Sequence, residues 1–258
     1  MSLFARNVEQ PKRITVPELR VGSGECLVIC GPNGSGKSSL LRLLAGVDRP
    51  SRGEVTWDTR SLVSMTPMER AAHIAWLPQR STLSGTLTVE SLVACARYRF
   101  FESEQVAQQH ALTLLGEHDL LHLAGRLTSE ISGGELQRVL IVSLVAQQAA
   151  VLMLDEPANH LDPKHQISTY QTLGRLWRAG QSVIIVSHDV RLAQLLGDSH
   201  RVRVLGIKHG QLVFEQKLAA PDLYESLGVL YESRFVPPGQ PGSLAVDLSA
   251  AADFKDNL

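Results

Sequence analysis

The sequence predicts an α/β fold built around a mostly parallel β-sheet. Four short apolar runs are unbroken rather than alternating, and each ends at glycine or polar residues, which is typical of strands buried on both faces of a parallel sheet. Helical patterns separate these runs, as in a wound α/β protein, whose ligand lies beyond the carboxyl ends of the strands. We expect strands at 26–30, 74–77, 151–154 and 182–186, and helices at 37–44, 133–147 and 165–177.

The composition is ordinary for a soluble globular protein of one large domain. The chain has 258 residues, of which 44% are hydrophobic and 20% charged, and its formal net charge is -1. A nucleic-acid partner is not expected, since such domains are usually basic. No window approaches the roughly 20 consecutive apolar residues of a membrane span, so we expect any membrane role to come from a partner chain. The odd set of three cysteines is interpreted as buried small apolar residues in a reducing cytosol: Cys26, Cys30 and Cys95.

Two stretches depart from the alternation of strands and helices. Residues 88–98 and 105–115 look helical with no buried strand between them, so we predict a helical insertion covering about residues 80–135. From Pro237 onward Pro, Gly, Ala, Ser and Asp dominate, which predicts a flexible tail over 237–258. A single domain is therefore expected over residues 1–236.

A glycine-rich segment follows the first buried run and opens a helix. Residues 31–38, GPNGSGKS, fit the pattern G-x-x-x-x-G-K-[ST]. Its glycines permit backbone angles that turn successive N–H groups toward one point, and the helix adds its positive end. Lys37 can place its charge against β- and γ-phosphates, and the Ser38 hydroxyl is a ligand for Mg²⁺. The segment predicts nucleotide binding by Gly31, Pro32, Asn33, Gly34, Ser35, Gly36, Lys37, Ser38 and Ser39.

Two adjacent carboxylates end the run at 151–154. Asp155 is placed to hold Mg²⁺ directly or through water, and Glu156 is placed to act as a general base toward the attacking water. Alone, such a pair fits a plain strand-end loop equally well. This chain also has the glycine-rich segment at residues 31–39, which we call the phosphate loop. Together with that loop, the carboxylate pair favours catalysis of phosphoryl transfer.

Residues 131–138, ISGGELQR, resemble the signature of the ABC ATPases, typically LSGGQ, and lie just upstream of the acidic strand as in that family. Position 131 is Ile and position 135 is Glu in place of the usual Leu and Gln. The resemblance implies that two copies pair head to tail, so that the signature of one closes over the γ-phosphate held by Lys37 of the other. The residues implied to act across this dimer are Ser132, Gly133, Gly134 and Glu135, with Asp162 communicating between the copies.

The other landmarks of the family follow in order. Gln79 resembles the glutamine-loop residue, whose amide reaches Mg²⁺ or the water, and His188 resembles the switch histidine that contacts the γ-phosphate. His160 and His165, which flank Asp162, are interpreted as structural. The family usually has an aromatic ring for adenine before the phosphate loop, but residues 11–15 offer none, so Lys12 or Arg13 is the candidate to stack on the base.

The resemblance covers about residues 14–235. It implies a P-loop NTPase core with a mostly parallel sheet, an antiparallel β subdomain and an inserted ABC helical subdomain, with ATP and Mg²⁺ as cofactors. Segments 65–79, 87–93 and 159–162 resemble the ATPases of the iron-siderophore, haem and vitamin B12 importers, whose relatives also carry molybdate-type oxyanions. This implies a separate permease dimer, an extracytoplasmic substrate-binding protein, and a peripheral position on the cytoplasmic face of the inner membrane.

Two alternatives remain beside the importer. One is a soluble ABC-type ATPase that acts in translation or DNA maintenance, although such proteins usually carry two modules or a long coiled coil. The other is an idle binding module, disfavoured because Lys37, Asp155, Glu156 and His188 are all present. No residue identifies the transported substrate.

Overall fold

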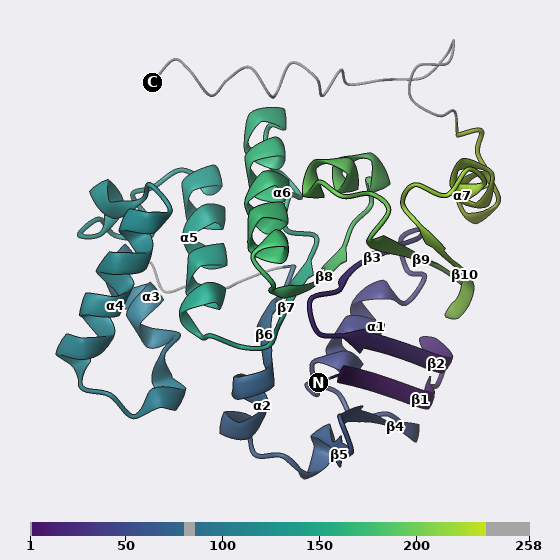
Figure 1. Cartoon of the computed structure of the whole chain (residues 1–258), viewed down its shortest axis with the longest axis horizontal. Coiled ribbons are helices and arrows are strands. Elements are labelled where there is room, and N and C mark those ends of the chain that lie inside the picture. The colour runs from purple at the N-terminus through teal and green to yellow at the C-terminus, as the bar shows by residue number, and fades with distance from the viewer. Residues whose placement is uncertain (1, 80–85, 236–258) are drawn as a thin grey trace.

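One ten-stranded sheet organises the protein in a computed structural model that describes residues 2–79 and 86–235 (Figure 1). The strand order is β5-β4-β1-β2-β10-β9-β3-β8-β7-β6. The strands are β1 (Ser2–Gln10), β2 (Ile14–Gly22), β3 (Cys26–Cys30), β4 (Arg52–Trp57), β5 (Arg60–Ser61), β6 (Ile74–Leu77), β7 (Val151–Asp155), β8 (Ser182–Val186), β9 (Val202–Lys208) and β10 (Gln211–Lys217). The predicted tail lies outside the described residues.

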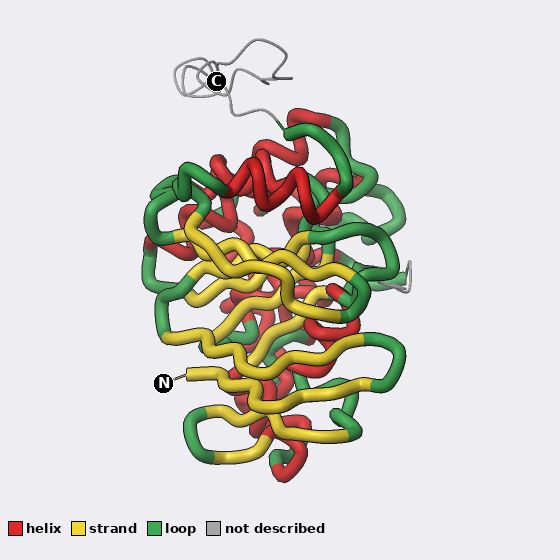
Figure 2. The backbone as a smooth tube through the Cα atoms, turned by 90° about the vertical axis from the view of Figure 1, so that its right-hand side faces the viewer, coloured by secondary structure: helices red, strands yellow, loops and turns green. Residues whose placement is uncertain are grey.

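The four apolar runs and β9, which pairs in parallel with β3, form the parallel part of the sheet, which confirms the predicted fold class. Strands β3, β7 and β8 are buried at every residue, and the pairs β3–β8, β7–β8 and β6–β7 are all parallel. The antiparallel pairs are β1–β2, β1–β4, β4–β5 and β9–β10. Figure 2 shows both parts as one stack of strands.

Helices cover both faces of the parallel strands. The α-helices are α1 (Lys37–Leu44), α2 (Pro67–His73), α3 (Val89–Cys95), α4 (Glu104–Glu117), α5 (Gly133–Ala146), α6 (Pro163–Arg178) and α7 (Leu223–Tyr231). Short 3₁₀ helices are η1 (Leu62–Ser64), η2 (Tyr98–Phe100), η3 (Leu121–Leu123) and η4 (Val190–Leu196).

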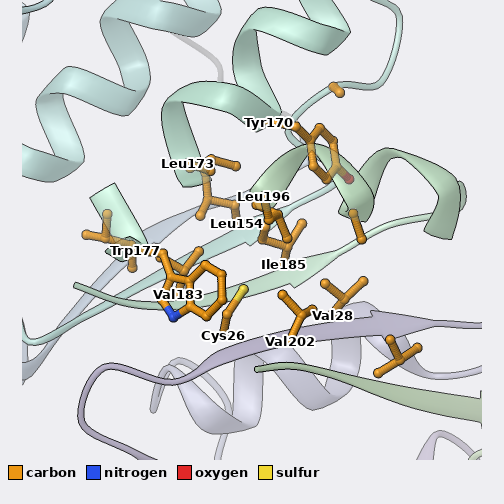
Figure 3. Close-up of a cluster of buried hydrophobic side chains, with 14 of the residues drawn as sticks. Cys26, Val28, Leu154, Tyr170, Leu173, Trp177, Val183, Ile185, Leu196 and Val202 are labelled. Carbon is orange, nitrogen blue, oxygen red and sulfur yellow. The ribbon is translucent and has the colours of Figure 1, made fainter. Parts of the chain in front are cut away.

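Two buried clusters lie on opposite faces of the sheet because side chains alternate along a strand. Cys26, Val28 and Cys30 of β3 pack with residues of α5, α6 and α7, whereas Leu27 and Ile29 pack with α1 and β1. Figure 3 shows the first cluster, in which Trp177 of α6 lies over the parallel strands. The packing fixes the carboxyl ends of β3, β7 and β8 at a common edge.

Helices α3 and α4 lie at the far side of α5 from the antiparallel strands (Figure 1). They pack on α5 around a third buried cluster, to which Val89, Val93, Ala111, Leu115 and Val139 belong. Helix α5 is shared, since its Leu140 and Ile141 face the sheet instead. The middle of α5 therefore contacts both the sheet and the cluster of α3 and α4.

The interpretation of all three cysteines as buried was wrong for one of them. Cys26 and Cys30 are buried in β3, but Cys95 is exposed at the end of α3. It lies two positions after the buried Val93, and residues two apart point to nearly opposite sides of a helix. Within residues 2–79 and 86–235, no helix has the length and apolar character needed to span a membrane.

Candidate nucleotide site

An open cavity of about 650 Å³ lies beyond the carboxyl ends of β3, β7 and β8. It brings together the phosphate loop, the residue after the acidic strand, the glutamine after β6 and the histidine after β8. The lining residues are Lys12, Arg13, Asn33, Gly34, Gly36, Lys37, Ser38, Ser39, Gln79, Glu156, Asn159, His160 and His188.

The phosphate loop needs glycine at its two closest approaches to neighbouring backbone. Gly31 has φ of 150°, and a Cβ there would lie 2.0 Å from the carbonyl oxygen of Ile207 in β9. Gly36, the N-cap of α1, has φ of 107°, and its Cβ would lie 2.5 Å from the carbonyl oxygen of Arg13. Any side chain at either position would displace the loop from β9 or from the β1–β2 turn.

The ammonium group of Lys37 is held inside the loop. Its Nζ donates to the carbonyl oxygens of Gly31 at 2.8 Å and Pro32 at 2.9 Å. Burial lowers the pKa of Lys37, and the nearby carboxylates of Glu156 and Asp155 act against that shift. A charged group with two neutral acceptors in a partly desolvated position gains strongly from an anion, which is the property a phosphate site requires.

Asp155 ends β7 with its side chain buried and only partly satisfied. The residue is 4% exposed, and its Oδ1 has no hydrogen-bond partner. Desolvation raises the pKa of the carboxyl group, while a hydrogen bond from the Ser38 hydroxyl lowers it. An unpaired buried carboxylate oxygen beside a hydroxyl fits a divalent cation such as Mg²⁺. Among the described residues there is no group of three or more His, Cys, Asp or Glu that could hold a metal ion by itself.

Three side chains contact the carboxylate of Glu156: those of the predicted site residues Gln79 and His188, and that of Asn159. Glu156 Oε2 accepts from Gln79 Nε2 at 2.5 Å and from Asn159 Nδ2 at 2.9 Å, and Glu156 Oε1 contacts His188 Nε2. The Glu156 side chain is 7% exposed, although its backbone adopts the left-handed conformation with φ of 53°. Such a conformation in a non-glycine residue is costly, and it is held here by neighbours that converge on the carboxylate.

Hydrogen bonds from Tyr170 and Asp189 to Ser187 hold the turn that carries His188. Tyr170 of α6 is buried, and its hydroxyl donates to Ser187 Oγ at 2.7 Å. Ser187 Oγ in turn accepts from the Asp189 backbone N–H at 3.2 Å. These bonds hold both neighbours of His188, so its ring is positioned at the mouth of the cavity.

Residues 132–135 form a capping box at the start of α5. The carboxylate of Glu135 accepts from the backbone N–H and the hydroxyl of Ser132, both at 2.8 Å, and the Glu135 N–H donates to Ser132 Oγ at 3.3 Å. These bonds lower the pKa of Glu135. Glutamate in place of the usual glutamine thus has a local structural role. None of these residues lines the cavity of the same chain.

Helix α5 begins against the turn that contains Asp162. Asp162 caps α6 by accepting from the His165 N–H at 2.9 Å, and its other oxygen lies 2.8 Å from His165 Nδ1. The His165 ring lies so close to Gly134 that a Cβ there would be 2.2 Å from its Cδ2. His165, interpreted as structural, therefore joins two segments of the predicted dimer surface.

The two signature glycines are expected to respond differently to alanine. Gly134→Ala would force the His165 ring aside, so we expect a loss of about 1–3 kcal/mol in the free energy of unfolding, measured by denaturant titration of the ATP-free chain. Gly133 has open space around its Cβ position, so Gly133→Ala is expected to keep or slightly raise that stability. The double variant Gly134→Ala/His165→Ala should regain most of the loss. Equal destabilisation by the two single variants would contradict this packing.

Sequence reasoning did not assign a site role to Asn159 or His160, which both line the cavity. Asn159 comes three residues after Glu156 and bonds to it, and His160 has φ of 63° in the same turn. Lys12 and Arg13, the candidates to stack on the base, occupy the β1–β2 turn and line the cavity. Among the described residues, no Phe, Tyr or Trp lines the cavity.

Comparison with known proteins gives matches over most of the chain. Residues 15–159 match the family model described as ABC transporter. The hemin import ATP-binding protein HmuV of Pseudomonas aeruginosa is 38% identical over 199 residues, which are 75% of this chain and 76% of that protein. The protein of the same name from Bradyrhizobium diazoefficiens is 34% identical over 248 residues, or 90% of each chain.

Solved structures with the same fold are ABC ATPase cassettes. The dimeric structure of a bacterial ABC transporter cassette matches with a TM-score of 0.73 and 27% identity, over 84% of this chain and 99% of that chain. A dimeric post-hydrolysis state with ADP and phosphate matches with a TM-score of 0.72 and 26% identity, over the same shares. An inward-facing transporter of metal-chelate type has a TM-score of 0.75 at 23% identity, over 89% of this chain and 88% of that chain, and shows likeness of fold alone.

Proposed function

Because the chain belongs to the ABC transporter family of ATP-binding proteins, we propose that it is the ATP-hydrolysing subunit of an importer for haem or a related metal chelate. The proposed ATP hydrolysis rests on one observation. The side chains of Gln79, Asn159 and His188 converge on Glu156 in the cavity lined by the phosphate loop. The importer part rests on relatives named for hemin import.

In this proposal the phosphates of ATP lie along the loop from Gly31 to Ser39. Lys37 exchanges its two carbonyl acceptors for β- and γ-phosphate oxygens, which are stronger acceptors because they are charged. Ser38 and Asp155 would hold Mg²⁺, with Gln79 as the third candidate through its amide oxygen. When bound, Mg²⁺ would supply charge neutralisation for the phosphates.

Glu156 acts as the general base that accepts a proton from the attacking water. His188 and Gln79, which contact its two oxygens, orient that water and the γ-phosphate. Oε1 contacts only His188, whereas Oε2 accepts from both Gln79 and Asn159, so Oε1 keeps the capacity to accept a proton from water.

The complete site requires a second copy of the chain. Ser132 and Gly133 at the start of α5 do not line the cavity of their own chain, and Gly133 has open space before it. The start of a helix attracts an anion through the positive end of its dipole and its first backbone N–H groups. In a head-to-tail dimer this surface covers the γ-phosphate held by the other copy, and Asp162 lies beside it.

Closure of the dimer on ATP is the step that drives transport. Helix α5 packs with α3 and α4 through Val139, Val142 and Ala146, so closure at the start of α5 moves these helices as one body. We place the chain on the cytoplasmic face of the inner membrane, where these helices and the Gln79 segment push on a separate permease dimer fed by an extracytoplasmic binding protein. ATP binding favours the closed state because only that state offers both faces of the site.

Purification of the full chain from membranes of its own cells in mild detergent tests this function. We expect equal amounts of this chain and a protein with many membrane-spanning helices, and ATP hydrolysis stimulated by haem-loaded but not haem-free binding protein. In intact cells, Glu156→Gln should abolish growth on haem iron. Normal haem uptake in that variant, or stimulation by ribosomes or DNA instead, would overturn the proposal.

A further inference from the structure

The first glycine of the phosphate loop is held from two sides by residues far apart in the chain. Its carbonyl oxygen accepts from Lys37 Nζ at 2.8 Å. Its backbone N–H donates to the hydroxyl oxygen of Tyr231 at 3.0 Å. Gly31 is buried, so each of these backbone groups needs a partner within the protein.

The hydroxyl of Tyr231 is anchored by the core and by the neighbouring strand. Tyr231 ends helix α7, whose Leu223, Leu227 and Leu230 are buried against the parallel strands. Its ring packs against that of Phe235, with centroids 5.4 Å apart. The position of the hydroxyl is thus set by the packing of α7.

The last turn of α7 is also tied to β9. Lys208 donates to the carbonyl oxygen of Val229 at 3.2 Å and pairs with Glu232 at 2.8 Å. Ile207, next to Lys208, is the residue whose carbonyl oxygen lies against Gly31. Strand β9 and helix α7 therefore form one support behind the start of the phosphate loop.

We propose that Tyr231 is a positioning residue for ATP binding, which holds the start of the phosphate loop in place when Lys37 leaves Gly31 for the nucleotide. The inference rests on the proposed function, because it assumes that Lys37 moves to phosphate. At that moment the Gly31 carbonyl loses its ammonium partner, and the bond to Tyr231 remains. The loop N–H groups that follow keep the geometry that ATP requires.

The chemistry of the hydroxyl suits this role. A phenol can accept one hydrogen bond and still donate its own proton to another group. Burial raises the pKa of Tyr231, so the group stays neutral and adds no negative charge beside the phosphates. Phenylalanine at this position would keep the ring contact with Phe235 and leave the Gly31 N–H without an acceptor.

The test compares Tyr231→Phe with Tyr224→Phe in the same helix. Tyr224 also loses a hydroxyl bond, since it accepts from Gln194 Nε2 at 3.1 Å, but it does not touch the phosphate loop. We expect Tyr231→Phe to raise the KM for ATP about tenfold with kcat within about twofold of wild type, because an unpaired buried N–H weakens the loop. Tyr224→Phe should leave both constants unchanged.

Hydrogen exchange of the Gly31 amide gives a second readout that does not need hydrolysis. The amide should be protected in wild type and in Tyr224→Phe, and should exchange at least about tenfold faster in Tyr231→Phe. Unchanged KM and unchanged exchange in Tyr231→Phe would overturn the inference, as would equal changes in the two variants. Failure of the wild type to bind ATP would instead overturn the proposed function.

Discussion

Glu156→Gln is expected to lower kcat for ATP hydrolysis by about 10²–10⁴-fold, the usual contribution of a general base. The amide keeps the size of the side chain and can still bond to Gln79 and Asn159, but it cannot accept a proton from water. ATP binding should persist, so a dimer that closes but cannot hydrolyse its ATP should accumulate. Phosphate release and size-exclusion chromatography with Mg²⁺-ATP measure the two effects.

A matched control for this variant is Glu225→Gln in α7, which removes one exposed carboxylate that does not line the cavity. It should leave both the hydrolysis rate and the elution volume unchanged. Hydrolysis at the wild-type rate by Glu156→Gln would remove Glu156 from the role of base and would leave the cluster around it without a catalytic explanation.

Lys37→Ala is expected to weaken ATP binding by about 100-fold, since a hydrogen bond from a charged donor contributes up to about 3 kcal/mol. Removal of the ammonium group also changes the surroundings of two backbone carbonyl groups. The carbonyl oxygens of Gly31 and Pro32 would face the phosphates without the ammonium group between them. Isothermal titration with a non-hydrolysable ATP analogue measures the effect directly.

Lys217→Ala at the exposed end of β10 is the control for net charge, and it should bind the analogue as wild type does. If Lys37→Ala also bound normally, the phosphates would have to lie elsewhere in the cavity.

Local pattern was enough to predict the elements that position the site. The runs at 26–30, 74–77, 151–154 and 182–186 are all strands of the parallel sheet, because a strand buried on both faces has no polar positions to obscure it. The phosphate loop and the acidic pair could be located because each motif follows such a strand directly. The fold class could therefore be predicted from residues that lie close together in the sequence.

Contacts between distant segments could not be predicted in the same way. Tyr231 bonds to Gly31 across 200 positions, and nothing near Tyr231 in the sequence marks it. Strands β9 and β10 were not predicted: β10 alternates between exposed and partly buried residues, and neither strand ends in a motif that bears on the site. The contact of His165 with Gly134 depends on how α5 and α6 pack, which pattern alone does not specify.

The role of residues 131–135 in a dimer could be predicted only from the family resemblance, because the geometry of a single chain does not contain it. Ser132 and Gly133 lie outside the cavity, so a reading of one chain would treat residues 131–135 as a capped helix start and nothing more. The departure at Glu135 has a physical account only in the structure, where the carboxylate completes the capping box with Ser132.

The central claim is that each ATP lies between Lys37 of one copy and the start of α5 of the other. Two variants disable one face each: Lys37→Ala removes the phosphate contact, and Gly133→Glu places a negative charge in open space where the partner's γ-phosphate would lie. Glutamate is favourable at a helix start, so Gly133→Glu should fold normally. Each variant alone should be nearly inactive.

A mixed dimer of these two variants, isolated through two different affinity tags, is the most direct measurement. Head-to-tail pairing gives it one site with both faces intact and one site with both faces disabled. The account predicts that ATP hydrolysis by the mixed dimer rises well above that of either parent. Hydrolysis no higher than the parents, in a mixed dimer shown to form, would contradict a site shared between two copies.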